Sequence, residues 1–576
     1  MAASDRGDAE REEFHQVIDG ARAGPVLISG SRGRIAAPAE SRHNHRMLDR
    51  LAIGTLALIA AVAAFTFRDY GLGWDDYTHS EFGDLLVALF SSGFRDLRAL
   101  SFVNLYMYGG GFDMVAALAA KISPFDLFET RRLAGAAVGI LGLGLTWRIA
   151  RRAGGPLAGL IALILLAACP LYYGHMFMNA KDAPFAVAMA VLLLALVRTI
   201  EEYPLPSRAT VVLLGLGLGL AIGSRILGVI ACFYALAAYA LLVAEDARAR
   251  GLRPAAMRLA NFLWLLLPAA ALGYLIMGLL WPWAILAPLN PLRAIGYFAN
   301  FFETPWKEMY EGALVSVPDM PASYVPRLFA LKLPEIMLAL GLAGMAGAFI
   351  AAARRELPPA QRATLLLLAL AAALPVAIAM ITRPALYNGV RHFVFVVPPF
   401  AVLGGVAGAW ALARLRSLGR TPFIAGAAMV AAALALPLSD MVRLHPYQYT
   451  HFNWLAGGVR SADENYMLDY WGLAFKQASE ELRVVLDARS ETAPGGRRWI
   501  VAVCGPQRPA EVALGPQFKT IGDARGADFA MMLGEFYCRD LKAPVLAEVT
   551  REGVMFARVY DIRGLNVTNL LTLPPP

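Results

Sequence analysis

Residues 51–77 read LAIGTLALIAAVAAFTFRDYGLGWDDY, and this stretch decides the fold. Its first part is an apolar run close to the ~20 residues that a helix needs to cross a bilayer. Two adjacent carboxylates, Asp75 and Asp76, follow it directly. Charge beside a bilayer is costly unless it binds or catalyses something. The stretch therefore predicts a membrane protein with a functional site at the mouth of its first span.

The rest of the chain repeats the apolar pattern. The 576 residues are 58% hydrophobic and only 17% charged, with a mean hydropathy of +0.53. We expect a polytopic α-helical membrane protein with about eleven transmembrane helices. These spans start near Leu51, Leu133, Pro156, Ala183, Ala209, Ile226, Leu259, Pro334, Ala363, Phe393 and Pro422. The join between the fifth and sixth, Gly223-Ser-Arg225, is short enough that a re-entrant helix pair is an alternative there.

The basic residues predict how the spans are oriented. The net charge is +8, but the arginines cluster in short loops after every even-numbered span, so they indicate topology and not nucleic-acid binding. By the positive-inside rule these loops and the N-terminus are cytoplasmic, and the C-terminus is extracytoplasmic. The loop arginines are Arg148, Arg151, Arg152, Arg198, Arg208, Arg248, Arg250, Arg253, Arg258, Arg354, Arg355, Arg362, Arg414, Arg416 and Arg420.

Three domains follow from these patterns. Residues 1–47 are polar and Arg-rich and predict a disordered cytoplasmic tail before a retained signal anchor. Residues 48–443 form the transmembrane domain, with a long first outer loop at 68–132 that contains helical patterns at 81–97 and 105–118. These two helices either lie in the membrane interface or pack on neighbouring spans.

Residues 444–576 predict a small extracytoplasmic α/β domain. A helix is expected at 477–486, strands at 499–503, 529–533, 545–550 and 554–560, and a hairpin turn at Glu552-Gly553. Cys504 and Cys538 lie in this domain and form a disulfide only if the compartment is oxidising, which their spacing does not decide.

Asp75 and Asp76 are the first candidate catalytic residues. Adjacent side chains point in different directions, so we expect different roles. One carboxylate suits a general base, and the other suits a residue that orients the base or binds a hydroxyl or a metal. The structural alternative is a helix cap for the following segment.

The other chemistry-bearing residues lie in later outer loops. Lys181 precedes a helix whose dipole disfavours a cation, which suggests an anionic ligand, whereas Asp182 also suits a helix cap. Arg225 and Arg391 either extend to the interface or converge on a phosphate. Other candidates at the same mouths are His392 for phosphate and His175, Asn179, Tyr387 and Asn388 for the acceptor or the sugar.

Several short motifs resemble one superfamily. Trp74-Asp-Asp-Tyr77 at the start of the first outer loop and Lys181-Asp182 after span three resemble the GT-C glycosyltransferases, in particular the protein O-mannosyltransferase and lipid A aminoarabinose transferase group. The family loop commonly reads Asp-Glu where this chain has Asp-Asp. Residues 445–458 (HPYQYTHFNWLAGG) and Asp469-Tyr-Trp-Gly472 resemble bacterial members of the superfamily.

The resemblance implies an inverting membrane glycosyltransferase of the bacterial plasma membrane. Its donor would be a polyprenyl-phosphate sugar and its acceptor a hydroxyl on a glycan, a lipid or a protein. Asp75 would be the general base, supported by Asp76 and Asp182. The donor phosphate would be held by Lys181, Arg225, Arg391 and His392. A divalent metal is possible, and no other cofactor is implied.

Two other classes of protein remain open. A transporter or lipid flippase would also have about a dozen spans, although such proteins often show two similar halves, and no clear repeat is found here. A non-catalytic scaffold is the third reading. Charges at the outer mouths and a large outer domain favour the transferase over both.

Overall fold

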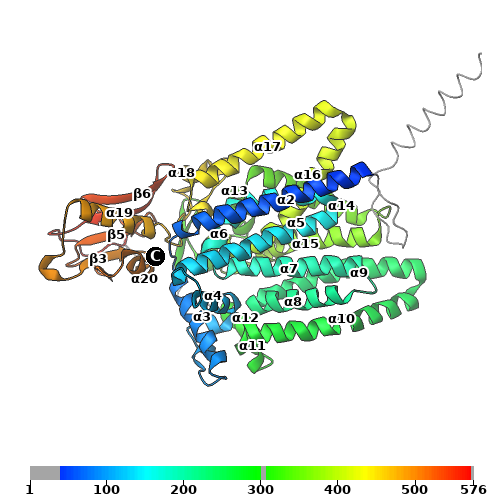
Figure 1. Cartoon of the computed structure of the whole chain (residues 1–576), viewed down its shortest axis with the longest axis horizontal. Coiled ribbons are helices and arrows are strands. Elements are labelled where there is room, and N and C mark those ends of the chain that lie inside the picture. The colour runs from blue at the N-terminus through cyan, green and yellow to red at the C-terminus, as the bar shows by residue number, and fades with distance from the viewer. Residues whose placement is uncertain (1–38, 300–305, 573–576) are drawn as a thin grey trace, which may run out of the picture. The chain divides into compact units, whose positions relative to one another are not determined.

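The computed structural model describes residues 39–299 and 306–572. Contacts divide the chain into residues 1–47 and 48–576, and the second unit is described here. Within the described residues, nine helical segments are long and apolar enough to cross a membrane. The helices concerned are α2 (Ala39–Thr66), α5 (Leu127–Ala167), α7 (Asp182–Glu201), α9 (Ala231–Arg250), α10 (Leu252–Leu280), α14 (Glu335–Ala353), α15 (Pro359–Thr382), α16 (Val397–Leu418) and α17 (Arg420–Arg443), most of them visible in Figure 1.

The two other predicted spans are also helical. One is α8 (Arg208–Ser224), which has 17 residues. The other is the second arm of α5, which turns back at Gly155, where φ is +86°. A Cβ on Gly159 would lie 2.8 Å from the ring of Trp147, so the two arms are antiparallel neighbours. The predicted fold class, a polytopic helical protein with a small C-terminal sheet domain, is confirmed.

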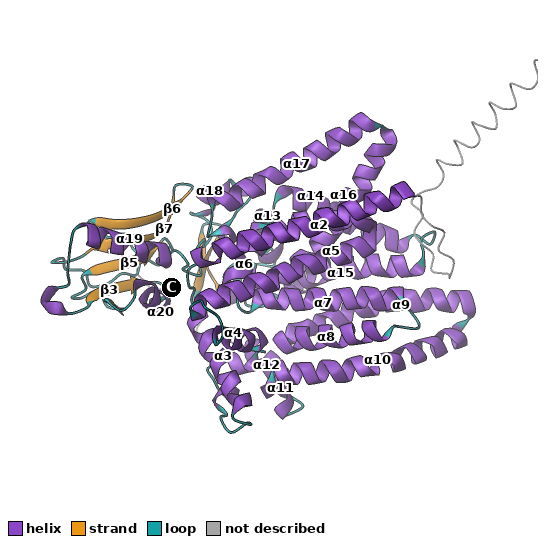
Figure 2. Cartoon of the chain, in the orientation of Figure 1, coloured by secondary structure: helices purple, strands orange, loops and turns teal. Residues whose placement is uncertain are grey.

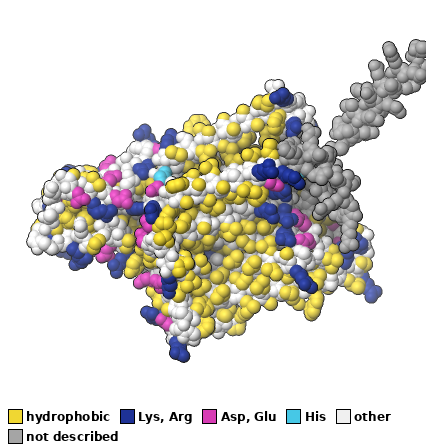
Figure 3. All heavy atoms as spheres, in the orientation of Figure 1, with side chains coloured by type: hydrophobic (Ala, Val, Ile, Leu, Met, Phe, Trp, Pro, Cys, Tyr) yellow, Lys and Arg dark blue, Asp and Glu magenta, His cyan; other side chains and the backbone are white. Residues whose placement is uncertain are grey.

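The surface of the bundle suits a lipid environment. On the face shown in Figure 3, hydrophobic side chains cover most of the helical part. The helices also expose large apolar side chains: Phe65 is 86% exposed and Trp264 71% exposed. Soluble proteins rarely expose apolar patches of this extent, so the helices are built to meet lipid.

Helix α2 begins at Ala39, earlier than the predicted start near Leu51. The residues before Leu51 include Glu40 and Arg46, which favour helix, so the span helix continues into the predicted tail. The prediction for residues 1–38 lies outside the described residues.

Short elements cover one end of the bundle. The first outer loop contains α3 (Asp76–Ser91) and α4 (Gly111–Ala120), which pack on each other, and α4 also packs on α5. The sequence left two positions open for this helix, in the membrane interface or packed on a neighbouring span, and α4 takes the second. A hairpin of β1 (Lys307–Tyr310) and β2 (Ala313–Ser316), which the sequence analysis did not predict, lies between α10 and α14. The remaining short elements before the C-terminal domain are η1 (Phe67–Asp69), η2 (Arg98–Leu100), η3 (Leu105–Met107), α6 (Pro170–Met178), η4 (Ile226–Ile230), α11 (Pro282–Leu286), α12 (Asn290–Ala299), η5 (Val317–Asp319), α13 (Tyr324–Lys332) and η6 (Arg391–Val396).

We call residues 444–572 the C-terminal domain, which is the orange sheet with its helices in Figure 2. After η7 (Gln448–Thr450), η8 (Trp454–Ala456) and α18 (Gly458–Ala462) come α19 (Phe475–Ala488), η9 (Pro494–Gly496), β3 (Trp499–Cys504), α20 (Gln507–Leu514), β4 (Phe518–Ile521), β5 (Phe529–Leu533), β6 (Val545–Arg551) and β7 (Val554–Asp561). The strand order is β4-β3-β5-β7-β6. Strand β3 is parallel to β4 and β5, and β7 is antiparallel to β5 and β6.

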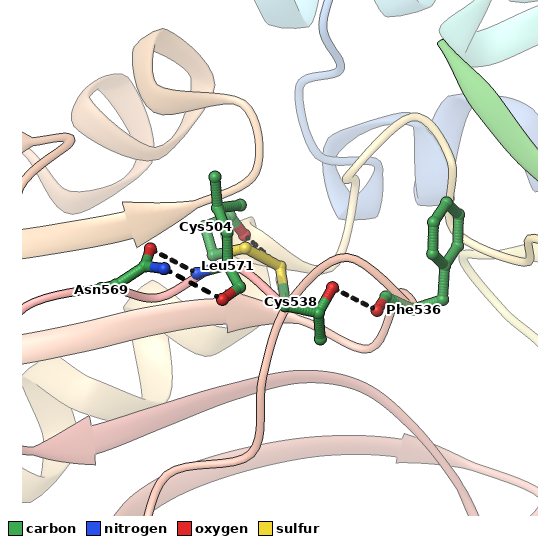
Figure 4. The surroundings of a disulfide bond; sticks show 6 residues. Cys504, Phe536, Cys538, Asn569 and Leu571 are labelled. Atoms are coloured by element: carbon green, nitrogen blue, oxygen red, sulfur yellow. Dashed lines mark hydrogen bonds between the residues drawn. A yellow bond between two sulfur atoms is a disulfide. The ribbon is translucent and has the colours of Figure 1, made fainter. Parts of the chain in front are cut away.

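The predicted helix, four strands and hairpin turn of this domain are confirmed. The turn residues Glu552 and Gly553 both have positive φ, at 52° and 81°. Cys504 and Cys538 form a disulfide (Figure 4). Strand β4, with four residues, and helix α20, with eight, were not predicted, because each is short.

The C-terminal domain contacts the start of the first outer loop. The Trp74 backbone N–H donates to the Trp471 carbonyl at 3.2 Å. A Cβ on Gly71 would lie 2.1 Å from the Leu473 carbonyl oxygen, so the two backbones are in close contact there. We call the end of the bundle where this contact lies the site end, and the end that carries Gly155 and the α9–α10 turn the opposite end.

Candidate functional site

Asp76 is a buried anchor of the first outer loop. Its carboxylate accepts hydrogen bonds from two guanidinium nitrogens of Arg132 on α5, at 2.8 and 2.6 Å. It also accepts from the Gly73 backbone N–H at 2.8 Å. Arg132 in turn donates to the Gly71 carbonyl at 2.5 Å. The pair therefore holds the loop on α5 and leaves Asp76 little freedom to meet a substrate.

Asp75 is arranged differently although it is the next residue. Its side chain is 43% exposed and lies 3.5 Å from Arg391 Nη1. Burial of the carboxyl group raises its pKa, but the positive charges of Lys181 and Arg391 outweigh this and hold the pKa below its ordinary value. Asp75 is therefore ionised at neutral pH, faces cations and has room to accept a proton.

A narrow cavity lies beside Asp75. Its walls come from α3, from the segment before α7 and from the C-terminal domain. The lining residues are Asp75, Asp76, His79, Met178, Asn179, Ala180, Lys181 and Trp471. Residues that are far apart in the sequence thus meet around one carboxylate.

Asp182, the first residue of α7, is a counter-ion for two arginines. Its carboxylate lies 2.5 Å from Arg225 Nη1 and 3.9 Å from Arg391 Nη1. It also accepts a hydrogen bond from the Asn179 side chain at 3.0 Å. With 1% of its side chain exposed, Asp182 is placed to hold cations in position.

Arg391 links the two carboxylates, Asp75 and Asp182. It begins η6, is 3% exposed, and its guanidinium carbon lies 4.8 Å from the ring centres of both Tyr387 and Trp471. Its Nε has no hydrogen-bond partner among the described residues. An arginine held between two aromatic rings is fixed in direction, and it retains an N–H group for a ligand.

Lys181 is the cation least engaged by carboxylates. It forms no ion pair with any residue that the structure describes, and its Nζ lies 4.3 Å from the centre of the Tyr108 ring. Burial lowers the pKa of Lys181 to about 8, although the charge of Asp75 acts in the opposite direction. The amine is thus mostly charged at neutral pH and has no carboxylate in direct contact among the described residues, which is the condition that favours an anionic ligand.

Arg225 and His392 line a second cavity, which has a volume of about 370 Å³. Most of its walls are apolar, and Tyr108 and Tyr387 lie near the two polar side chains. The Nδ1 atom of buried His392 has no hydrogen-bond partner among the described residues. The apolar lining includes Met107, Ile226, Leu227, Ile230, Phe298, Pro375, Ile378, Leu386, Phe393 and Phe395.

The predicted acceptor-binding residues mostly support this arrangement. The Asn179 side-chain oxygen accepts from the backbone N–H groups of Lys181 and Asp182 at 3.1 and 2.7 Å, which shapes the turn before α7. His175 is fully buried and contacts Asn179 and Tyr470 through its two ring nitrogens, at 3.1 and 3.4 Å. Asn179 therefore forms part of the cavity wall, and His175 lies behind it.

Tyr387 and Asn388 belong to the loop before η6. Tyr387 packs against Arg391 and His392. The Asn388 backbone N–H donates to Glu308 of β1 at 2.9 Å. Glu308 also accepts from the Tyr324 hydroxyl at 3.0 Å, and burial raises the pKa of this glutamate to about 7. The unpredicted β1–β2 hairpin therefore holds the loop that carries Arg391.

A second buried cluster was also missed. His79 Nδ1 lies 2.7 Å from Asp113 Oδ2, and Arg131 donates to the other oxygen of Asp113 at 2.5 Å. It joins α3, α4 and α5 behind Asp75. No local pattern in the sequence marks these partners, because each pairs with a residue from a different helix. Among residues 39–299 and 306–572, no group of three or more His, Cys, Asp or Glu side chains is placed to hold a metal ion.

Part of the chain matches a known family. Residues 111–274 match the family model of the dolichyl-phosphate-mannose-protein mannosyltransferases. This segment runs from α4 into α10 and includes Lys181, Asp182 and Arg225, but not Asp75 or Arg391. Over this part of the chain, the resemblance to the GT-C glycosyltransferases is confirmed.

Comparison with whole proteins gave these results. No curated protein matches the sequence. Among solved structures, ArnT from Cupriavidus metallidurans in the apo state is similar, with 18% identity over 88% of this chain and 98% of that chain and a TM-score of 0.47. The same protein bound to undecaprenyl phosphate has 17% identity over 88% of this chain and 97% of that chain, with a TM-score of 0.46. The oligosaccharyltransferase of Archaeoglobus fulgidus in the apo form has 14% identity over 78% of this chain and 62% of that chain, with a TM-score of 0.45.

Proposed function

We propose that the protein is a membrane glycosyltransferase that moves a sugar from a polyprenyl-phosphate donor to a hydroxyl acceptor. One observation carries the proposal: the ionised, half-exposed Asp75 lies beside Lys181 and Arg391. A carboxylate that can take a proton and cations that can take a phosphate thus lie close together at the site end. The family match over residues 111–274 supports the same donor class, since dolichyl phosphate is a polyprenyl phosphate.

The second cavity suits both parts of the donor, the lipid tail and the phosphate. The lipid tail requires apolar walls that continue towards lipid, and most of the lining is apolar. The phosphate requires cations, and Arg225 of the lining and Lys181, which both lie over the ring of Tyr108, would supply them. Because Arg225 already neutralises Asp182, the phosphate would be bound chiefly by Lys181 and by the unpaired Nε–H groups of Arg225 and Arg391. His392 would contribute only in the tautomer with a hydrogen on Nδ1.

The reaction needs one proton transfer and one displacement. Asp75 takes the proton of the acceptor hydroxyl, the acceptor oxygen forms a bond to the anomeric carbon, and the bond from that carbon to the phosphate oxygen breaks. The bonding electrons leave with the phosphate, whose charge the cations stabilise. Attack from the side opposite the phosphate inverts the anomeric centre. Asp76 and Asp182 act as positioning residues, through Arg132 and Arg225.

The proposed location follows from charge placement. The site end carries the C-terminal domain, and the loops rich in arginine lie at the opposite end, which the positive-inside rule assigns to the cytoplasm. The site and residues 444–576 would then be on the outer face of a bacterial plasma membrane, where the Cys504–Cys538 disulfide is stable. The acceptor would be a glycan, a lipid or a protein at that face.

A transfer assay tests the proposal. The purified protein in liposomes is given radiolabelled undecaprenyl-phosphate mannose, glucose or aminoarabinose together with a cell-envelope extract, and labelled product is separated and identified by mass spectrometry. We expect transfer from at least one donor, with loss of the corresponding glycan from cells that lack the gene. Movement of a lipid-linked sugar across the bilayer without any transfer would instead favour a flippase.

A further inference from the structure

Residues 469–472 connect the C-terminal domain to the candidate site. The Asp469 carboxylate accepts backbone hydrogen bonds from Gly472 and Leu473, both at 3.0 Å, and from Ala474 at 2.9 Å. The Tyr449 hydroxyl donates to the same carboxylate. These bonds hold a tight turn at the start of α19, and the direction of the Trp471 side chain is set by that turn.

Trp471 lies beside both Asp75 and Arg391, the two groups that the proposed reaction needs. It is 3% exposed and lines the cavity beside Asp75. Its ring centre is 4.8 Å from the guanidinium carbon of Arg391. Its carbonyl accepts from the backbone N–H of Trp74, the residue before Asp75.

The contact with the Asp75 loop is close enough to demand a glycine. A Cβ on Gly73 would lie 1.3 Å from a ring carbon of Trp471, so the indole rests directly on the Gly73 backbone. The indole N–H has no hydrogen-bond partner among the described residues. The ring is therefore held by packing and by Arg391, not by a hydrogen bond of its own.

We propose that Trp471 is a positioning residue through which the C-terminal domain sets the distance between Arg391 and Asp75. The inference rests on the proposed transferase function and gives the C-terminal domain a role in it. Position 471 requires a large aromatic ring, because the ring contacts both the Gly73 backbone and the Arg391 guanidinium. Loss of the ring would let Arg391 and the loop at 71–76 move independently, and the base and the phosphate-binding cation would lose their relative alignment.

Variants of the full-length protein in liposomes test this, using whichever undecaprenyl-phosphate sugar the wild-type protein transfers. For Trp471→Phe, which keeps an aromatic face and removes an N–H that has no partner, we expect kcat within about threefold of wild type. For Trp471→Leu we expect kcat to fall at least about tenfold, while the KM for the donor changes less than about threefold, because Lys181 and Arg225 still hold the phosphate.

Trp499→Leu is the matched control. Trp499 is also buried in the C-terminal domain, on β3, and Arg563 lies 5.7 Å from its ring centre, but it is not part of the cavity beside Asp75. We expect this variant to lose thermal stability as Trp471→Leu does and to keep the wild-type kcat per folded molecule. A second control is Gly73→Ala, which would displace the ring: combined with Trp471→Leu, it should lower kcat no further than Trp471→Leu alone.

The outcomes separate the two proposals. If wild-type protein transfers no sugar, the proposed function is wrong. If wild-type protein is active and Trp471→Leu keeps its kcat, or if Trp499→Leu lowers kcat equally, the positioning role of Trp471 is wrong while the transferase function stands.

Discussion

The two ends of the helical bundle both carry many charged side chains, and they pair them in different ways. At the opposite end, Arg248 lies 2.6 Å from Glu245 with 56% of its side chain exposed. At the site end, Arg225 lies 2.5 Å from Asp182, with side-chain exposures of 9% and 1%. Exposed pairs contribute about 0.2–1 kcal/mol, whereas breaking a buried pair costs about 3–5 kcal/mol. Burial, and not the number of charges, therefore marks the end that carries a costly site.

A second difference concerns the partly or fully buried cations at the two ends. At the opposite end the arginines Arg258 and Arg362 each have a carboxylate within 3.0 Å. At the site end Lys181 has no ion pair in the described part of the chain, whereas a buried Nε without a hydrogen-bond partner occurs at both ends, on Arg198 as well as on Arg225 and Arg391. Buried polar groups are normally satisfied, so Lys181 is the cation that points to an absent anion.

The largest expected effect is on catalysis by Asp75. Asp75→Asn removes the proposed base and should lower sugar transfer by about 10²–10⁴-fold, the usual contribution of general acid–base catalysis. Expression and thermal stability should remain near wild type, because the side chain is half-exposed. Asp84→Asn, an exposed carboxylate on the same helix α3, is the control and should keep full activity. Near wild-type transfer by Asp75→Asn would exclude the base role.

Substitution of the neighbouring carboxylate, Asp76, should act mainly on stability. Asp76→Asn breaks the buried pair with Arg132 and should destabilise the protein by about 3–5 kcal/mol, since a guanidinium is left buried without its counter-charge. The measurement is the apparent melting temperature in detergent, compared with Asp75→Asn. Equal melting temperatures for the two variants would contradict the division between an anchor and a base.

Glu308 should make stability depend on pH at the site end. Its pKa of about 7 in the folded protein is above the ordinary value of 4.5, so the folded state holds the proton more tightly. The stability that this gives is complete below pH ~4.5 and is lost as the pH rises through ~7, a total of about 3 kcal/mol.

Glu308→Gln removes this titration. The melting temperature of the variant relative to wild type should therefore rise between pH 5 and pH 8. A difference that stays constant over this range would show that the glutamate does not titrate there.

Donor binding should depend on Lys181 to a smaller degree. Lys181→Met removes a cation that lacks a counter-ion and should weaken binding of undecaprenyl phosphate by about 10–100-fold, the worth of one hydrogen bond to a charged group. Arg248→Met at the opposite end is the matched control, and binding should be unchanged within error. If both substitutions have the same effect, net charge and not the site would explain the binding.

The sequence predicted the parts of this account that depend on local patterns. Apolar runs of membrane-spanning length identify the helices, and alternating strands identify most of the C-terminal sheet. Asp75, Lys181, Asp182, Arg225 and Arg391 were identified as candidates because their charges lie beside apolar runs, and the structure brings them together.

The different environments of Asp75 and Asp76 could not be predicted. The distinction depends on Arg132, which is 56 positions away in sequence and has no motif that marks it as a partner. The same holds for Glu308, whose hydrogen bonds reach a loop 80 positions away. Trp471 belongs to a motif that stood out in the sequence, but its contact with Arg391 arises only when the C-terminal domain packs on the bundle. Long-range pairings of this kind leave no periodic signal.

The most direct test of the central claim is an electron cryomicroscopy structure of the protein with the undecaprenyl-phosphate sugar that it transfers. The account predicts the phosphate within about 3.5 Å of Lys181 and a guanidinium nitrogen of Arg225 or Arg391, with the anomeric carbon between the phosphate and Asp75. A phosphate bound elsewhere, or a sugar on the side of the phosphate away from Asp75, would contradict it.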